Sequence, residues 1–189
     1  RPSYSRLYYI LSGGGFVETE RETVSLVSGK TYLIPAGLTL HYGCPGRMTQ
    51  LYFHVSVRAP DGYDLFGRLD RILECGENIG DLGADYASGQ VLRETLTRCR
   101  VEADVARFAI QAGLERTLEV NRSAFLKAVF AAVSDCLSAS LTIAEVARRM
   151  NMSESALTKR FRREFGSPLG RYIDEMVLQD VIRRLMGTE

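Results

Sequence analysis

The chain has 189 residues, 46% hydrophobic and 25% charged, with a formal net charge of +1. This composition is typical of a folded protein with one ordinary domain or two small ones. No apolar run approaches the length of a membrane span, and the first residues lack the pattern of a signal peptide, so we expect a cytoplasmic protein with no membrane partner.

Four cysteines, Cys44, Cys75, Cys99 and Cys136, lie far apart in the sequence. Their spacing matches neither a zinc knuckle nor a redox pair, and a disulfide framework is not expected at this chain length. We therefore expect reduced thiols, most of them buried.

Residues 7–57 consist of short apolar runs separated by turn residues, such as the SGGG run at 12–15. Runs of this kind predict a small antiparallel β-sandwich or barrel. In 48–57, Leu51, Phe53 and Val55 alternate with Tyr52 and His54, which predicts a half-buried strand.

From about residue 65 helix-forming residues take over, and two segments, 87–118 and 122–137, have helical spacing. Phe125, Val129 and Val133 form an apolar stripe on the second. Two interpretations stay open for these helices, a core role or a helical dimer seam.

The segment 141–166 predicts two short helices joined by a turn. Thr142 stands three positions before Glu145 as a capping box, Asn151 suits a left-handed helix end, and Ser153 suits the cap of the next helix. Leu157, Phe161 and Phe165 would form the buried side of this second helix. A third helix then runs from Leu169 to Leu185, with one apolar face that packs on the first two.

The outer side of the second helix is polar and basic, with Ser155, Thr158, Lys159, Arg162 and Arg163. A solvated charged face is the alternative interpretation, but the capping box, the turn and the buried stripe together favour a helix-turn-helix. A helix of this kind fits the DNA major groove, with its first residues at base edges and its Lys and Arg near phosphates.

The stretch LTIAEVARRMNMSESALTKRFRREFGSPLGRYIDEMVLQDVIRRLM resembles the first DNA-binding subdomain and connecting helix of AraC/XylS transcriptional regulators. YYILSGGG and VSGKTYLIPAGLTLHY look like the cupin-type sensing domain of that family. The resemblance implies a small-molecule effector in the cupin, a homodimer formed by the helices after it, binding to double-stranded promoter DNA, and RNA polymerase as a further partner. It carries over the following DNA-binding positions: Ser153, Ser155, Thr158, Lys159, Arg162 and Arg163.

Family members have a second helix-turn-helix after the connecting helix, and this sequence stops at Glu189, where it would begin. We expect the second half to be cut off or disordered. The two halves would enter successive major grooves about 34 Å apart.

A metal-dependent cupin enzyme is the main alternative function, because GKTYLIPAGLTLH, ending at His41, approximates the second cupin motif. The first motif, with its His pair and Glu, is not found. If 43–46 form a hairpin turn, His54 lies roughly 20 Å along the strand from the position opposite His41, too far for one ion. We therefore expect no metal, no cofactor and no catalytic residues. A domain that only dimerises or meets another protein is a further alternative.

Aromatic and basic residues in the strand region are the candidates for an effector pocket that takes a polar, hydroxyl-bearing or anionic ligand. They are Tyr9, Tyr32, His41, Tyr42, Arg47, Tyr52 and His54.

We thus predict an α+β chain with an N-terminal cupin-like antiparallel β-barrel or sandwich followed by helices. The predicted division is a sensing domain at 1–64, a helical linker or dimerisation region at 65–138, and the first helix-turn-helix subdomain with its connecting helix at 139–189.

Overall fold

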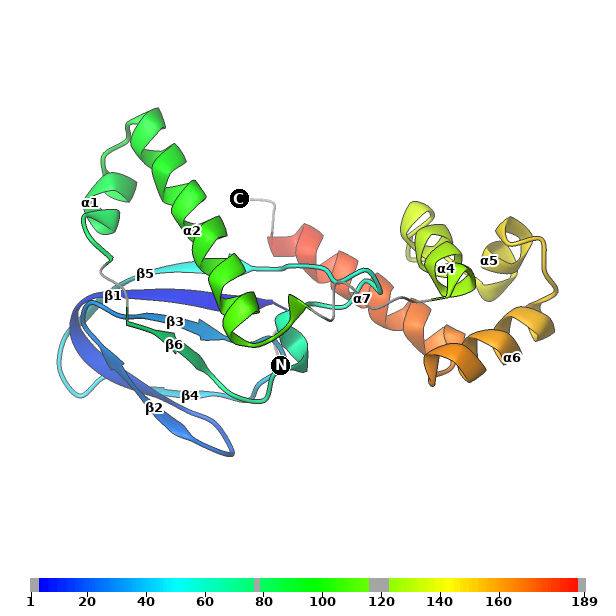
Figure 1. Cartoon of the computed structure of the whole chain (residues 1–189), viewed down its shortest axis with the longest axis horizontal. Coiled ribbons are helices and arrows are strands. Elements are labelled where there is room, and N and C mark those ends of the chain that lie inside the picture. Colours follow the sequence, from blue (N-terminus) through cyan, green and yellow to red (C-terminus); the bar gives the residue numbers. More distant parts are fainter. Residues whose placement is uncertain (1–3, 77–78, 116–122, 187–189) are drawn as a thin grey trace. The chain divides into compact units, whose positions relative to one another are not determined.

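The computed structural model describes residues 4–76, 79–115 and 123–186, which form two compact units (Figure 1). The sheet unit comprises Arg1–Val57 and Asp64–Thr117, and the helical unit comprises Arg58–Tyr63 and Leu118–Glu189. This division differs from the one expected at residues 64 and 138. The helix α4 (Ala124–Asp135) packs with the helices that follow it, and a six-residue segment after the fifth strand packs there too.

The sheet unit contains an antiparallel sheet, curled into a half-barrel, which confirms the predicted α+β class. The strand order is β2-β1-β3-β6, and β4 and β5 also pair with β1. The strands are β1 (Ser5–Glu18), β2 (Thr23–Val27), β3 (Thr31–Ile34), β4 (His41–Gly43), β5 (Met48–Val55) and β6 (Leu73–Cys75).

The glycine run at 12–15 lies inside β1, so the prediction of a turn there was wrong. Before the run β1 pairs with β3 and β5, and after it with β2 and β4. Gly13 has a φ of +71°, and a Cβ there would lie 1.9 Å from the Arg47 carbonyl oxygen. Glycine therefore lets one strand change partners where neighbouring backbone comes close.

Residues 43–46 do not form the expected hairpin turn either. β4 and β5 pair with the same edge of β1, with His41 opposite Glu18 and His54 opposite Arg6. The chain from β4 to β5 keeps its direction along β1, so the two histidines lie near opposite ends of that strand.

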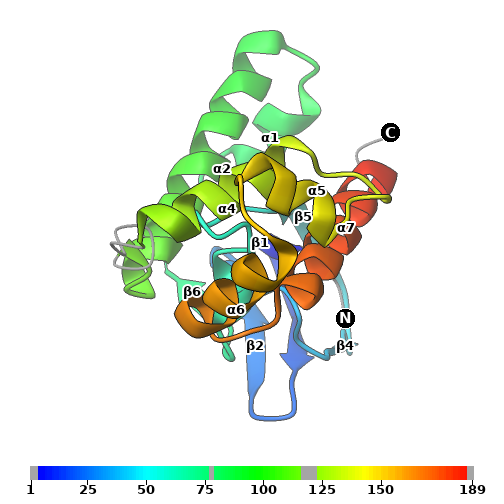
Figure 2. The ribbon, with the colours of Figure 1, turned by 90° about the vertical axis from the view of Figure 1, so that its right-hand side faces the viewer.

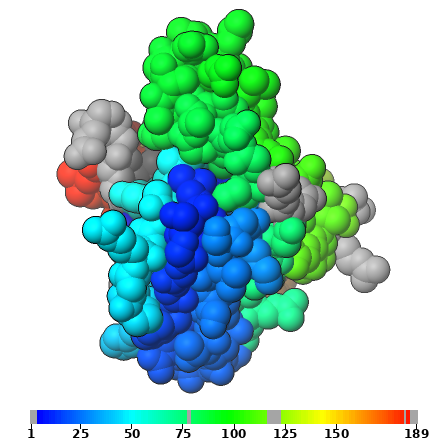
Figure 3. Space-filling model, turned by 90° about the vertical axis from the view of Figure 1, so that its left-hand side faces the viewer, coloured from blue at the N-terminus to red at the C-terminus, as the bar shows by residue number. Residues whose placement is uncertain are grey.

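Two helices, α1 (Leu82–Ala87) and α2 (Val91–Gln111), belong to the sheet unit, as does the short 3-10 helix η1 (Phe66–Arg68). The buried Tyr9 hydroxyl donates a 2.9 Å hydrogen bond to Asp104 on α2. Phe53 meets Tyr86 of α1 edge to face, with ring centroids 5.9 Å apart. These contacts fix the helices against one face of the sheet, and Figure 3 shows their green surface next to the blue and cyan strands.

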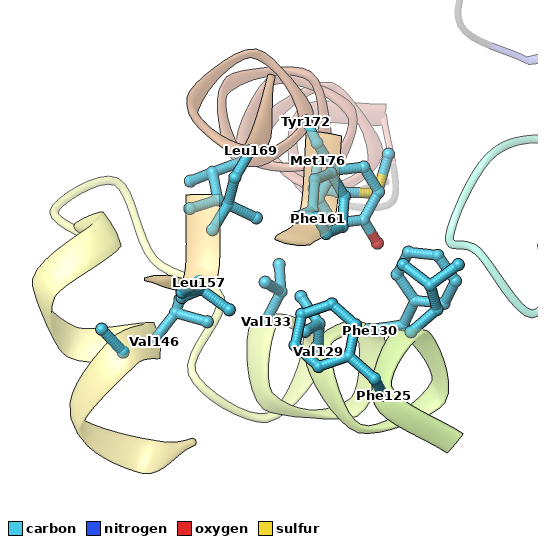
Figure 4. Packing of buried hydrophobic residues seen from close by; sticks show 13 residues of the cluster. Phe125, Val129, Phe130, Val133, Val146, Leu157, Phe161, Leu169, Tyr172 and Met176 are labelled. Atoms are coloured by element: carbon cyan, nitrogen blue, oxygen red, sulfur yellow. The ribbon is translucent and has the colours of Figure 1, made fainter. Parts of the chain in front are cut away.

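The helical unit contains α4, α5 (Ile143–Arg149), α6 (Glu154–Phe165) and α7 (Leu169–Met186), seen together in Figure 2. Their side chains meet in one apolar core, shown in Figure 4, around Val129, Val146, Leu157, Phe161 and Tyr172. The stripe on α4 is thus a core face. On α7 Tyr172, Ile173 and Met176 are buried, but Val181 and Leu185 are exposed, which corrects the predicted continuous apolar face.

The segment Arg58–Tyr63, here called the strap, is built into the helical unit. Tyr172 donates a 2.8 Å hydrogen bond to the Asp61 carbonyl, and the Tyr63 hydroxyl donates a 2.5 Å hydrogen bond to Glu175. Gly62 has a φ of +83°, and a Cβ there would lie 2.6 Å from the Met176 sulfur. The strap therefore packs as part of the helical unit, and hydrogen bonds through its backbone and through a side chain hold it there.

The four cysteines are free thiols, but Cys44 and Cys99 are exposed and the other two half-buried, so the prediction of burial was wrong. Among the described residues, no helix combines the length and the apolar character that crossing a membrane requires.

Candidate functional site

The helix pair α5 and α6 has the local geometry predicted for a helix-turn-helix. The Thr142 hydroxyl accepts the Glu145 amide at the start of α5, and the Ser153 hydroxyl accepts the Ala156 amide at the start of α6. Asn151, between the helices, has a φ of +51°, and Gly166 ends α6 with a φ of +88°. These capping and turn residues fix the direction in which α6 leaves α5.

One side of α6 is buried and the other is exposed. Leu157 and Phe161 are fully buried in the core of the helical unit. Of the six predicted DNA-binding residues, Thr158 is half-buried. The other five are exposed: Ser153, Ser155, Lys159, Arg162 and Arg163. The Thr158 hydroxyl donates to the Glu154 carbonyl at 2.7 Å, which leaves its oxygen lone pairs for an outside donor.

The cations of α6 differ in what they contact. Lys159 and Arg162 have no acidic partner among the described residues, and Arg163 lies 3.7 Å from Glu164. Arg160 pairs with Glu164 at 2.8 Å and lies 4.1 Å from the Phe125 ring centroid, so it belongs to the packing of α6 on α4. The outward charge is thus carried by Lys159, Arg162 and Arg163.

A cavity of about 440 Å³ lies in the sheet unit, on the face of β1 opposite α2. Its apolar walls include Phe16, Leu26 and Met48, and its polar groups come from Arg6, Tyr8, Tyr42 and Gln50. The size falls in the range of small-molecule sites, and apolar walls with few polar groups are typical of them.

Some of the polar groups of this cavity form hydrogen bonds with one another. The Arg6 guanidinium donates to the Tyr42 hydroxyl. Burial raises the pKa of Tyr8 well above its usual value, and a hydrogen bond with Tyr42 raises it further. The side-chain amide oxygen of Gln50 is buried and has no hydrogen-bond partner among the described residues, so it offers an acceptor to a ligand.

Only one of the seven predicted effector residues, Tyr42, lines this cavity. Tyr9 and Tyr32 are fully buried, with hydroxyls that donate to Asp104 and to the Ser25 carbonyl. The remaining four are exposed and do not line it: His41, Arg47, Tyr52 and His54. Burial lowers the pKa of His54, as does the positive charge of Arg6.

Sequence reasoning missed Arg6, Tyr8 and Gln50. In LYYIL the alternation places Tyr8 on one face and Tyr9 on the other, and the pairing of Tyr8 with Tyr52 and of Ile10 with Gln50 brings the strands together. The alternation was available from the sequence, but the pairing partners were not.

Within the described ranges, no group of three or more His, Cys, Asp and Glu side chains is placed to hold a metal ion. His41 and His54 pair with different ends of β1, so they do not form a joint site.

The outer face of α2 carries exposed small and apolar residues at alternating spacings of four and three. Leu92 and Leu96 are 79% and 63% exposed, and Ile110 is 57% exposed. With Cys99, Ala103 and Ala106, also exposed, they form one stripe, here called the α2 seam. This spacing is typical of a coiled-coil contact.

No family model matches the chain, and no curated protein matches it. Among solved structures, it is similar to unsaturated fatty acid bound ToxT from Vibrio cholerae, with 8% identity over 100% of this chain and 75% of that chain, at a TM-score of 0.47. A second ToxT structure, from Vibrio cholerae O395, has 9% identity over 100% of this chain and 76% of that one, at a TM-score of 0.45. ToxT is an AraC-family regulator.

Proposed function

We propose that this chain is a DNA-binding transcription regulator of AraC type, controlled by a small molecule that binds in the sheet unit. The observation that carries the proposal is α6 itself. Ser153 caps this helix, and the turn at Asn151 sets its direction. Leu157 and Phe161 bury one side in the core, and the exposed side is basic.

The proposed roles follow from position on α6. Ser155, Thr158 and Lys159 lie in the first turns, where a recognition helix meets base edges, so they read sequence. Arg162 and Arg163 lie near the end of the helix and contact phosphates. Ser153 caps the helix and adds a hydroxyl next to the DNA backbone.

The effector is proposed to bind in the 440 Å³ cavity of the sheet unit. Arg6 supplies a positive charge, Tyr42 and Tyr8 supply hydroxyls, and the buried Gln50 oxygen supplies an acceptor. These groups suit a polar or anionic ligand with an apolar body. An effector acts by binding one arrangement of the DNA-binding units more tightly than another.

A second copy of this chain is the proposed partner of the α2 seam. The seam is self-complementary. In an antiparallel pair of α2 helices centred on Val101, Leu92 would contact the partner's Ile110, and Leu96 would contact the partner's Ala106. Large residues thus face small ones or each other across a two-fold axis, as an isologous dimer requires. We expect the dimer to survive removal of everything after Leu137, since the seam lies before it.

DNA binding is tested by fluorescence anisotropy with a labelled random duplex at several salt concentrations. The proposal expects affinity that falls steeply with salt, because protein cations replace counterions at phosphates. Binding that does not change when Lys159, Arg162 and Arg163 are replaced together would contradict it. A metal cupin enzyme, the alternative, predicts a bound transition metal after native purification, which elemental analysis checks.

A further inference from the structure

A second cavity, of about 390 Å³, lies wholly within the helical unit, between the strap, α4 and the first half of α7. It is separate from the cavity of the sheet unit, and no residue lines both. Its volume falls in the range of small-molecule sites.

The walls of this cavity are apolar and firmly held. Phe130 and Val133 of α4, with Leu137 just after that helix, form one side, and Met176 of α7 and Pro60 of the strap contribute to the others. The hydrogen bonds from Tyr172 to Asp61 and from Tyr63 to Glu175 hold the strap in place. The cavity is therefore part of the fold of this unit.

Two cations, Arg58 of the strap and Lys127 of α4, line the same cavity. Both are exposed, and neither has an acidic partner among the residues that the structure describes. No acidic side chain is among the residues that line the cavity. Two cations without a carboxylate, next to an apolar wall, leave positive charge that an anion of matching shape would neutralise.

We propose that this cavity binds a small amphipathic anion, with a carboxylate or sulfonate between Arg58 and Lys127 and an apolar body against Phe130, Val133 and Leu137. A phosphate of DNA would use the two cations but not the apolar wall. The ligand would join the strap to α4 and stabilise the helical unit by binding only the folded state. The inference does not depend on DNA binding or on the sheet cavity.

The test is a titration of the full chain carrying Arg6→Ala, which removes the cation of the sheet-unit cavity so that this cavity does not compete for the probe. The probes are 1-naphthoate, followed by its intrinsic naphthalene fluorescence, and 1-naphthalenemethanol, the uncharged analogue of the same shape. We expect saturable one-to-one binding of the acid, at least about tenfold tighter than the alcohol, because charge-assisted hydrogen bonds add to the apolar contact. Equal affinity for the two probes, or binding without saturation, would overturn the proposal.

Variants locate the site. Arg58→Ala and Lys127→Ala each weaken 1-naphthoate binding about tenfold, and Ala131→Trp, at an exposed position on the rim, fills the cavity and abolishes it. Arg98→Ala, which removes an exposed cation from α2, leaves it unchanged. All these variants carry Arg6→Ala as well, so the sheet-unit cavity is the same in each of them. Full binding by Arg58→Ala, Lys127→Ala and Ala131→Trp would overturn the assignment.

Discussion

The guanidinium of Arg160 on α6 lies 4.1 Å from the centroid of the Phe125 ring on α4. Since Glu164 also pairs with Arg160, this cation is used inside the helical unit, while its neighbours Lys159 and Arg162 extend outward. Four cations that look equivalent in the sequence therefore divide into Arg160, which packs on α4, and three that are exposed and that we propose to contact DNA.

Lys159→Ala tests the proposed reading of bases. We expect specific affinity to fall by about 1–3 kcal/mol and the preferred base at one position to change, as for loss of a base contact. Competition binding against a panel of single-base variants measures both effects. Lys30→Ala, which removes a cation paired with Glu74 in the sheet unit, is the matched control and should change neither. An equal loss on every sequence would show that Lys159 contacts phosphate instead.

The double variant Arg162→Gln with Arg163→Gln tests the phosphate contacts. The slope of log affinity against log salt should become shallower by about 1 for each lost contact, equally on all sequences. Arg160→Gln is the matched control, because that side chain packs on Phe125. It should keep the slope and lower stability by about 0.5–1 kcal/mol. A slope that stays the same in the double variant would remove both arginines from the interface.

Leu96→Glu tests the α2 seam. A buried charge at a coiled-coil position destabilises association, so the variant should be monomeric where the parent is dimeric. Light scattering measures the mass, and Arg98→Glu, on the same helix but outside the seam, should stay dimeric. A monomeric parent, or a dimeric Leu96→Glu, would rule out the seam as the interface.

Asp64→Asn tests the buried carboxyl that accepts hydrogen bonds from Ser5, Phe66 and Gly67 through one oxygen. Burial raises the pKa of Asp64 above its usual value, against the lowering effect of those bonds. The ionised form is therefore disfavoured in the folded state, and the parent loses stability as pH rises from the unfolded pKa, about 3.9, through the folded one.

Asparagine keeps the accepting oxygen and cannot ionise, so the stability of Asp64→Asn relative to the parent should increase with pH across that window. Urea unfolding at a series of pH values between about 4 and 7 measures the difference. A relative stability that stays constant, or that decreases with rising pH, would mean that Asp64 is ionised at no cost in the fold.

The helices and turns of the helical unit could be predicted from the sequence because the residues that determine them act locally. Thr142, Asn151 and Ser153 each act on the backbone within a few residues, and each was placed correctly. Leu157 and Phe161 mark the buried side by helical spacing alone. The role of Arg160 could not be read, because Phe125 is 35 positions away in the chain.

The sheet unit could be read only in outline, because its contacts join distant residues. The glycine run predicted a turn by composition, yet it bends β1 between two sets of partners. The effector candidates were chosen by residue type, and pairing decided that Tyr8 and Gln50 line the cavity while Tyr9 is directed to Asp104. The packing of the strap on α7 could not be predicted either, since nothing in the sequence of its six residues indicates that contact.

Selection from a pool of random double-stranded DNA, repeated at several salt concentrations, tests the central claim most directly. The chain should enrich a common sequence, with affinity that falls as salt rises, and the triple variant Lys159→Ala, Arg162→Gln, Arg163→Gln should enrich none. Failure of the parent chain to enrich any sequence beyond the triple variant would contradict DNA reading by α6 and reduce the helix-turn-helix to a packing motif.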